Sequence, residues 1–316
     1  MKRKAIQLAN QTLVVSLPAK WVKQQGIKKG DEIEVKERGN NLIIECDSTN
    51  NKSLDKATVD TTNIRDLYGR TVSCMISGLN KAGFNEIKIK YDKHIAKKII
   101  EKLSREVFIG FPVVEQEEGM CVLRSISKDI EFEFNAALRR AFLVTISMGE
   151  SIINAIKAKK LLILGELLTL EHTNNQLTQF CERILNMSGY KDYTKTCFMY
   201  VIAWNLEKVC DEYKYICEYF SKEENNKTKI GKDIILLFEK VNKFIASYYE
   251  LLYKFDINKL NEQFKEYKQI EKKALELSKS KNQKEIFIIT RLLFAAARAD
   301  DFCTSVSMAN FERVPE

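Results

Sequence analysis

The apolar and polar positions follow two different patterns along the chain, and the pattern changes near Gly119. Before that residue, short β-branched runs are separated by glycines and polar clusters, which is typical of strands joined by turns. After it, apolar residues recur at helical spacing, only four further glycines occur, and no proline lies between Val113 and Val314. Long stretches without helix breakers predict long helices, so the chain is expected to be multidomain and mainly α.

Residues 1–46 predict a small β-rich domain with the order strand, strand, short helix, turn, strand, strand. A β-branched run stops at Pro18, and the short helix is closed by Gly26, a residue type that favours the left-handed conformation at a helix end. Two alternating runs follow, joined at Gly39-Asn40-Asn41, which is typical of a hairpin turn. The best-defined elements are strands at 13–17, 32–36 and 42–45 and a helix at 19–25.

Residues 47–62 contain three apolar residues in sixteen and are interpreted as a linker. Residues 63–127 then predict a small α+β domain with the order α-β-α-β-β. This domain carries no motif that points to chemistry, and His94 at the start of its second helix is interpreted as a surface residue. The predicted helices are 63–82 and 92–105, and the predicted strands are 86–90, 107–114 and 121–126.

Residues 128–316 predict six helices of similar length. Aligning each residue with the one 90 positions later places the third helix on the sixth, with Asp211 on Asp301 and Lys208 on Arg298. This faint repeat groups the helices as three plus three and predicts tandem three-helix bundles. The predicted helices are 129–157, 159–188, 190–221, 228–255, 257–280 and 283–312.

Charge distinguishes one end of the chain from the rest. The formal net charge is +8, from 51 cations and 43 acids, yet residues 1–30 alone contain seven cations and no acid. The rest of the chain is therefore nearly neutral. We expect an anionic partner to bind at the start of the chain.

The sequence excludes several classes of protein. No run of 18 apolar residues predicts a membrane span, and the start of the chain has no apolar segment typical of a secretory signal. Eight cysteines without a CxxC pair are interpreted as reduced core thiols of a cytoplasmic protein, ahead of zinc ligands or disulfides. A GxSxG motif, a phosphate-binding Walker loop and a GxGxxG motif are all missing, so the protein is not expected to be an enzyme.

Residues 12–45, TLVVSLPAKWVKQQGIKKGDEIEVKERGNNLIIE, resemble AbrB/MazE-like swapped-hairpin domains. The resemblance rests on the VxLP step, Trp21 in the short helix, the Gly26-Ile27 stop, the Lys29-Gly30-Asp31 turn and the final hairpin. It implies that two chains intertwine into one small β-barrel, which binds DNA through a basic face. A segment of this size can hardly build a core alone, and this also favours a homodimer.

Within that resemblance, cations of the first domain are the candidate DNA contacts. Arg3 is the candidate for reaching a base edge, while the other cations would contact phosphates. Lys28 and Lys29 are instead interpreted as surface residues of a turn. The predicted DNA-binding residues are Arg3, Lys4, Lys20 and Lys23.

The helical half resembles the PhoU family, whose fold is two tandem three-helix bundles. Residues 205–211, NLEKVCD, are similar to the NLERIAD-type helix of that family. Residues 171–175, EHTNN, lie where the family carries an acidic ExxxD motif. An AbrB-like domain followed by a PhoU-like domain resembles archaeal-type phosphate uptake regulators.

The PhoU pattern implies metal ligands. Carboxylates four residues apart share one helix face, and two such pairs make an oxygen-rich site for a divalent or iron-type cation. Glu207 and Asp211 keep one pair, whereas Asn175 replaces the acid that would follow Glu171. The same residues can equally form an ordinary solvated helix face. No other cofactor is implied, and the candidate metal ligands are Glu171, Glu207 and Asp211.

These resemblances lead to a DNA-binding transcriptional regulator of phosphate uptake. Its expected partners are DNA, a second copy of the chain, and a phosphate ABC transporter or signalling kinase, with no insertion into a membrane. The alternative is a PhoU-type adaptor that links a phosphate transporter to a signalling kinase and uses its first domain only to dimerise. A third hypothesis, an antitoxin, leaves most of the chain unexplained. Charge reversal of Arg3 and Lys4 separates the first two, because only DNA binding requires those charges.

Overall fold

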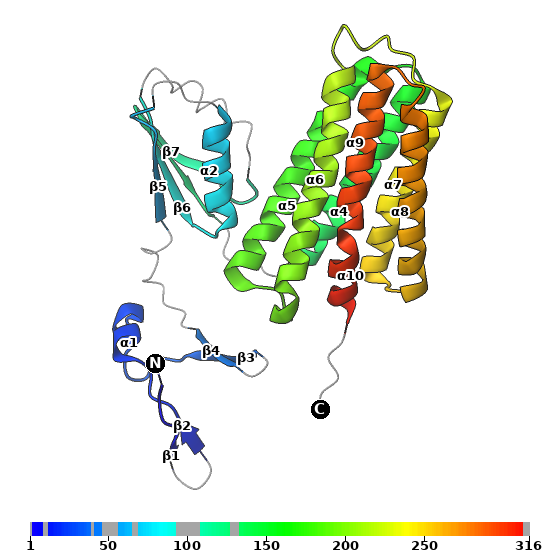
Figure 1. Ribbon diagram of the computed structural model, residues 1–316. Coiled ribbons are helices and arrows are strands. Elements are labelled where there is room, and N and C mark those ends of the chain that lie inside the picture. Colours follow the sequence, from blue (N-terminus) through cyan, green and yellow to red (C-terminus); the bar gives the residue numbers. More distant parts are fainter. Residues whose placement is uncertain are drawn as a thin grey trace. The chain divides into compact units, whose positions relative to one another are not determined.

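The computed structural model is multidomain and mainly α, as the sequence predicts (Figure 1). It divides into two compact units, Met1–Ala57 and Thr58–Glu316, and each unit is described by itself. The residues that the structure describes are 2–8, 12–38, 41–45, 56–64, 69–92, 108–126 and 133–311.

The first unit consists of two antiparallel hairpins and one short helix. Its elements are β1 (Ile6–Leu8), β2 (Thr12–Val14), α1 (Ala19–Gln25), β3 (Glu34–Arg38) and β4 (Asn41–Glu45). β1 pairs with β2, and β3 pairs with β4 so that Arg38 lies opposite Asn41. Helix α1 ends at Gly26, whose φ of 68° is the left-handed conformation expected there. The predicted helix at 19–25 is therefore confirmed.

The first unit has no core of its own among the residues that the structure describes. None of its described side chains is buried, and its strands form two separate two-stranded sheets. A closed barrel of the predicted swapped-hairpin kind would therefore need strands from a second chain. Seven large apolar side chains are between 37% and 69% exposed, namely Ile6, Leu8, Leu13, Val15, Val35, Leu42 and Ile44.

In its described residues, the second unit begins with a four-stranded sheet and one helix, and the first strand starts two residues before Thr58. Its elements are β5 (Lys56–Asp60), α2 (Gly69–Lys81), β6 (Glu86–Lys90), β7 (Val113–Glu117) and β8 (Met120–Arg124). The strand order is β5-β6-β8-β7, with β8 antiparallel to both of its neighbours. Val72 and Ile76 lie one turn apart on α2 and share a core with Ile87 and Ile89 of β6. Helix α2 therefore covers one face of the sheet (Figure 1).

The structure differs from the prediction of a linker over 47–62. Residues 56–60 form strand β5, and Val59 is only 8% exposed because it belongs to the core under α2. A strand with two apolar residues in five gives too weak an alternation to be recognised in sequence. Residues 46–55 and the predicted helix at 92–105 beyond Asp92, with His94, lie outside the described residues.

The described residues of the helical half, 133–311, form six long helices and one short one. They are α4 (Phe134–Lys157), α5 (Leu168–Ser188), α6 (Thr196–Phe220), α7 (Lys232–Tyr253), α8 (Ile257–Ser278), α9 (Gln283–Asp300) and α10 (Phe302–Asn310). Helices α4, α5 and α6 pack against one another, and so do α7, α8 and α9, while α4 contacts α7 and α6 contacts α9. This arrangement matches the predicted grouping of three plus three.

Some helix boundaries differ from the prediction. The second and third helices are preceded by 3₁₀ turns, η2 (Leu161–Gly165) and η3 (Tyr193–Lys195), and the sixth predicted helix divides into α9 and α10 at Asp301. The predicted N-cap at Asp256 is confirmed, since its side chain accepts hydrogen bonds from the backbone N–H groups of Asn258 and Lys259. Within the described helices, none combines the length and apolar character that crossing a membrane requires.

The internal repeat is visible in side-chain contacts as well as in the helix order. Lys208 Nζ lies 3.3 Å from Asp211 Oδ2 on α6, and Arg298 Nη1 lies 3.7 Å from Asp301 Oδ2 at the end of α9. These are the two pairs that the 90-residue offset superimposes. The repeated helices therefore carry an equivalent ion pair at an equivalent position.

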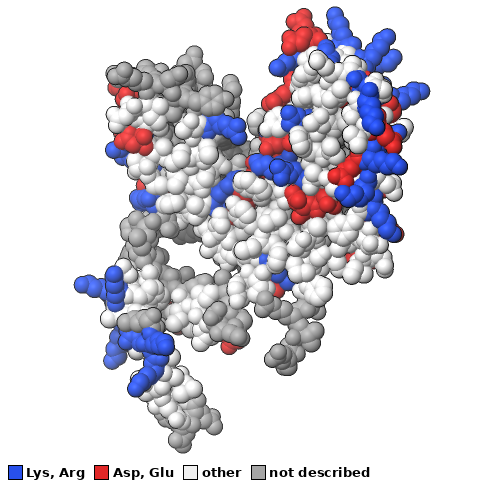
Figure 2. All heavy atoms as spheres, in the orientation of Figure 1, with Lys and Arg blue, Asp and Glu red and all other residues white. Residues whose placement is uncertain are grey.

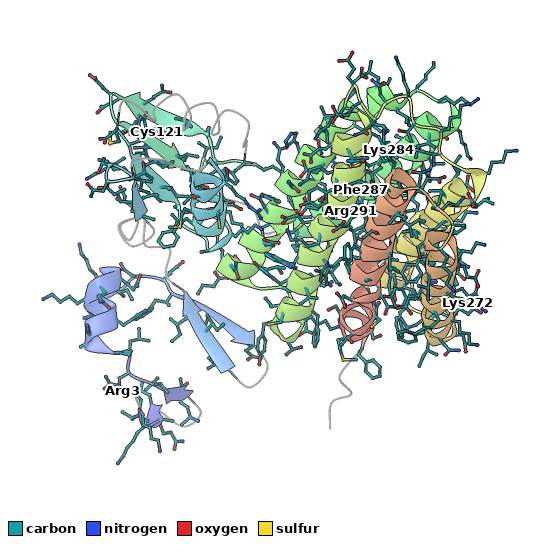
Figure 3. All side chains as sticks on the ribbon, turned by 45° about the horizontal axis from the view of Figure 1, so that its top comes forward. Arg3, Cys121, Lys272, Lys284, Phe287 and Arg291 are labelled. Carbon is teal, nitrogen blue, oxygen red and sulfur yellow. The ribbon has the colours of Figure 1, made fainter. Side chains whose placement is uncertain are left out.

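A cation–aromatic stack joins α9 to α6. Phe287 and Arg291 lie one turn apart on α9 (Figure 3). The Arg291 guanidinium lies 4.7 Å from the ring centroid of Tyr215, and its Nη1 donates to Glu212 Oε2 at 3.1 Å. The Tyr219 ring stacks on Phe287 with centroids 4.3 Å apart. This seam holds together the two halves of the helical repeat.

The cysteines only partly follow the prediction of core thiols. Burial raises the pKa of Cys121 to about 11 and that of Cys217 to about 12, so neither is a thiolate at neutral pH. Cys74 and Cys197 are exposed, and the prediction is wrong for them. Cys46 lies outside the described residues, and the buried cysteines among the described ones are Cys121, Cys181, Cys210 and Cys217.

Candidate functional site

The first candidate site is the basic start of the first unit. Lys20 and Lys23 lie three residues apart on α1, which places their side chains on one face, and both are exposed. Arg3 and Lys4 precede β1 and are exposed too. Basic side chains gather over α1 and the start of the chain in Figure 2. Arg3 is labelled in Figure 3. All four predicted DNA contacts are therefore accessible to a large anion.

The remaining cations of this segment belong to a turn. The backbone N–H of Lys28 donates to Asp31 Oδ2 at 2.7 Å, and the chain reverses at Gly30 with a φ of 98°. Lys28 and Lys29 lie beside the one acid that closes this turn. Their position agrees with the interpretation of these lysines as surface residues of a turn.

The second candidate site is the group of carboxylates predicted as metal ligands. Glu207 and Asp211 lie one turn apart on α6, close to Glu171 of α5, but lysines lie between them. Lys208 Nζ is 2.9 Å from Glu207 Oε1 and 3.3 Å from Asp211 Oδ2. Lys214 Nζ is 3.0 Å from Glu171 Oε1 and also pairs with Asp211. An ammonium thus pairs with every predicted ligand.

These residues, as arranged, do not fit a metal ion. Asn175 turns its amide nitrogen toward Glu171 Oε1 at 2.7 Å, so the amide donates there instead of offering an oxygen ligand. Among the described residues, no three His, Cys, Asp or Glu side chains are placed to hold a cation. The metal-ligand prediction for Glu171, Glu207 and Asp211 therefore has no support in the geometry, because lysines already neutralise the carboxylates.

The ion-pair network extends from the helical bundle to α2. Lys81, the last residue of α2, places its Nζ 3.2 Å from Glu207 Oε2 and 2.7 Å from Glu182 Oε2. The Glu182 side chain has no exposed surface. Burial raises the pKa of the Glu182 carboxyl to about 7, although Lys81 opposes the shift. Glu182 is the most strongly perturbed carboxyl of this network.

Arg183, next to Glu182 on α5, joins the bundle to the sheet layer. It is 2% exposed, and its Nη1 donates to the backbone oxygens of Asn80 at 2.7 Å and Phe84 at 2.8 Å. Its Nη2 donates to Asn85 Oδ1 at 2.8 Å. The cation therefore satisfies carbonyls at the C-terminal end of α2, where the helix dipole favours positive charge.

Lys81, Glu182 and Arg183 were not predicted as functional residues from the sequence. The signal for the latter two is a pair of charged residues inside the apolar run FCERIL, residues 180–185, at positions that a helix buries. No sequence pattern indicates their partners, since Asn80 precedes Arg183 by 103 residues.

The stability of the second unit is expected to depend on pH through Glu182. Its pKa of about 7 in the folded protein lies above its ordinary value of 4.5, so the folded state binds this proton more tightly than the unfolded state does. The contribution of Glu182 to the free energy of unfolding is therefore largest below pH 4.5 and falls as the pH rises through 7. The loss is about 3 kcal/mol.

Urea unfolding of the full chain at pH 5 and pH 8 measures this effect. The Glu182→Gln variant removes the titrating group and is expected to flatten the pH dependence. Glu276→Gln, which alters an exposed carboxylate of α8, is the matched control and should keep the wild-type slope. An unchanged slope in Glu182→Gln would assign the pH dependence to other groups.

Comparison with known proteins adds information on the first unit only. The family model described as "Antidote-toxin recognition MazE, bacterial antitoxin" matches residues 6–46. No curated protein and no solved structure matches the chain. The matched segment contains both hairpins and α1, the elements on which the AbrB/MazE-like resemblance rests. The chain therefore carries a MazE/AbrB-like domain at its N-terminal end.

Proposed function

We propose that the protein is a non-enzymatic, DNA-binding transcriptional regulator whose first unit binds DNA as a homodimer. One observation carries the proposal. Residues 1–30 contain seven cations and no acid, and no described side chain on the strands of this unit is buried. A monomer with these properties would leave its apolar strand faces in water. A dimer on DNA accounts for both the charge and the exposed apolar surface.

The exposed side chains of the two hairpins favour a dimer. Leu8 and Leu13 of the first hairpin are 60% and 69% exposed, and Leu42 of the second is 67% exposed. Full burial of one such side chain would stabilise the protein by about 1.5–3 kcal/mol relative to leaving it in water. A second copy of the same hairpins is the natural cover, because swapped-hairpin domains, which this segment resembles, close one barrel from two chains. Several exposed large apolar side chains gathered on the strands of one small unit favour an interface.

The positive charge of the first unit favours DNA as its partner. Two copies double the number of cations, and the i,i+3 pair Lys20 and Lys23 would be presented twice, on symmetry-related helices. Phosphate contacts of this kind supply most of the affinity of a DNA-binding domain and make that affinity dependent on salt. Symmetric presentation favours a DNA site with two related halves.

We further propose that the helical half relates this regulator to phosphate uptake and contacts a phosphate transporter or its kinase. The support is the grouping of the helices as three plus three and the PhoU-like segment Asn205–Asp211 on α6. Chromatin immunoprecipitation of the protein under phosphate limitation tests this part. Enrichment at promoters of phosphate-transport genes supports it, whereas uniform coverage of the genome contradicts it.

Substitutions in the basic segment are expected to weaken DNA binding selectively. Arg3→Ala/Lys4→Ala and Lys20→Ala/Lys23→Ala each remove two cations per chain. We expect each to weaken binding to duplex DNA and to reduce the slope of log affinity against log salt by roughly 3–4, since a dimer loses about four phosphate contacts. Fluorescence anisotropy of labelled duplex DNA at several salt concentrations gives both quantities.

Lys28→Ala/Lys29→Ala is the matched control, because it removes the same charge from the turn closed by Asp31. It should change the salt slope by much less than the other two variants. Sedimentation analysis checks that all variants stay dimeric. Equal losses in all three variants would mean that only net charge matters, and a wild-type affinity independent of salt would refute DNA binding. In that case the adaptor function, with a first unit that only dimerises, becomes the better account.

A further inference from the structure

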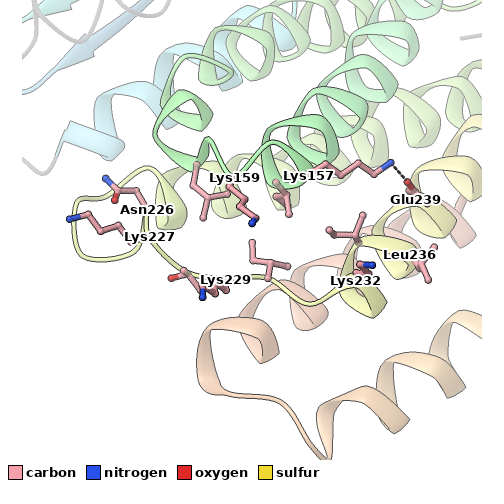
Figure 4. A pocket seen from close by; sticks show the side chains of 13 residues that line it. Lys157, Lys159, Asn226, Lys227, Lys229, Lys232, Leu236 and Glu239 are labelled. Atoms are coloured by element: carbon pink, nitrogen blue, oxygen red, sulfur yellow. Dashed lines mark ion pairs between the residues drawn. The ribbon is translucent and has the colours of Figure 1, made fainter.

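A hollow in the helical half has no role in the function proposed above. It has a volume of about 740 Å³, which lies in the range of small-molecule sites. The end of α4, the segment between α6 and α7, and the first turns of α7 surround it (Figure 4). All of these elements belong to the second unit.

The rim of the hollow is strongly basic. Its lining contains one acid, Glu239, which pairs with Lys157 as the dashed line in Figure 4 shows. In the part of the chain that the structure describes, the other four lysines have no carboxylate partner and remain exposed. The five lysines, which reach the hollow from three different segments, are Lys157, Lys159, Lys227, Lys229 and Lys232.

The floor of the same hollow is apolar. Ile156 and Leu161 are buried beneath it, and Ile230 and Ile235 are half-buried along its side. Leu236 is 63% exposed, although it lies one turn into α7 beside the other apolar residues. A hydrocarbon group placed here would cover Leu236 and the two half-buried isoleucines. Basic rim and apolar floor therefore adjoin within one site.

Two further features of the lining concern Thr228 and Lys159, and the first of them favours a ligand. Thr228 lines the hollow, and its buried Oγ1 has no hydrogen-bond partner among the described residues, so the hydroxyl of this lining residue is left unsatisfied. Lys159 has a φ of 57°, and no other described non-glycine residue has a positive φ. This left-handed residue closes the C-terminal end of α4, where the Lys160 N–H donates to the Ala155 oxygen at 2.9 Å, and it turns the chain at the edge of the hollow.

We propose that this hollow binds an amphipathic anion, a small molecule that joins one anionic head group to an aliphatic chain. The head group would lie among Lys159, Lys229 and Lys232 and accept a hydrogen bond from Thr228. The chain would cover the apolar floor. The lining contains no aromatic side chain for base stacking, which disfavours a nucleotide or single-stranded nucleic acid. Free phosphate would leave the floor in water.

Isothermal titration calorimetry of the full chain with octyl phosphate, kept below its micelle concentration, tests the proposal. We expect one molecule per chain with a dissociation constant on the order of 10–100 µM. Affinity should rise about three- to fourfold for each methylene from butyl to octyl phosphate, because the chain becomes buried. Inorganic phosphate should bind at least tenfold more weakly. Titration with octanoate, which has a carboxylate head group, shows whether the site prefers carboxylate or phosphate.

Three variants assign the binding to this hollow. Lys229→Glu/Lys232→Glu should weaken octyl phosphate binding at least tenfold, and Thr228→Val should weaken it about three- to tenfold while keeping the side-chain shape. Lys272→Glu/Lys273→Glu on α8 (Lys272 is labelled in Figure 3) is the control and should bind as the wild type does. Circular dichroism confirms that all variants are folded.

Several results would overturn the proposal. They are the absence of saturable binding, an affinity independent of chain length, inorganic phosphate binding as tightly as octyl phosphate, and equal binding by the rim and control variants. None of these results bears on DNA binding by the first unit.

Discussion

Replacing Arg183 by methionine is expected to lower the free energy of unfolding of the second unit by about 3–5 kcal/mol. Methionine keeps most of the side-chain volume but donates no hydrogen bond. The backbone oxygens of Asn80 and Phe84 and the side-chain oxygen of Asn85 would then lose their donor. Because Arg183 is 2% exposed, water does not readily replace it.

The loss should also change the form of the unfolding curve. Arg183, together with the Lys81 ion pairs, ties α2 and its sheet to α5. Without Arg183, we expect the sheet layer to unfold before the bundle, and urea unfolding followed by circular dichroism should show two transitions. Arg140→Met is the matched control, because Arg140 lies exposed on α4 and should alter stability by no more than about 0.5 kcal/mol. Equal effects of the two substitutions would refute this role of Arg183.

Replacing Gly149 by alanine is expected to destabilise the bundle by about 2–3 kcal/mol. A Cβ atom at this position would lie 2.6 Å from Cγ of Asn242 and 2.9 Å from Cε2 of Tyr213, and closer still to Asn242 Oδ1. Neither neighbour moves easily, since Tyr213 donates to Asn242 Oδ1 at 3.0 Å and Asn242 donates to the backbone oxygen of Ile146 at 3.1 Å. The better helix propensity of alanine, about 1 kcal/mol, offsets only part of the clash.

Gly78→Ala is the matched control for Gly149→Ala. Gly78 also lies inside a helix, α2, but a Cβ there meets no atom within 4 Å. We expect this variant to be more stable than the wild type by about 0.5–1 kcal/mol. Thermal and urea unfolding of both variants measure the difference. If both alanines stabilise the protein, α4 and α7 do not approach each other closely at Gly149.

Local patterns predicted much of the fold correctly. The helix at 19–25 and the strand at 86–90 match the structure residue for residue, because each has its own apolar period and a clear stop. Prediction failed where the signal was weak or came from contacts distant in sequence. Strand β5 has only two apolar residues, and the end of α9 at Asp301 carries neither glycine nor proline.

The candidate sites divide in the same way. Arg3, Lys4, Lys20 and Lys23 form an exposed basic segment that could be recognised from composition, because an excess of charge needs no partner to be seen. The carboxylates predicted as metal ligands do lie near one another. Their role could not be predicted, since sequence spacing places side chains on a face but does not say what lies opposite.

The sequence by itself determined the multidomain architecture, the six long helices and the concentration of positive charge at one end. These properties depend on residues close together in the chain, whose periodicity and composition act locally. Only the tertiary structure decided that lysines neutralise Glu171, Glu207 and Asp211, and that Arg183 joins the bundle to α2. Those contacts join residues distant in the sequence, and their energies depend on burial and distance, which no local pattern records.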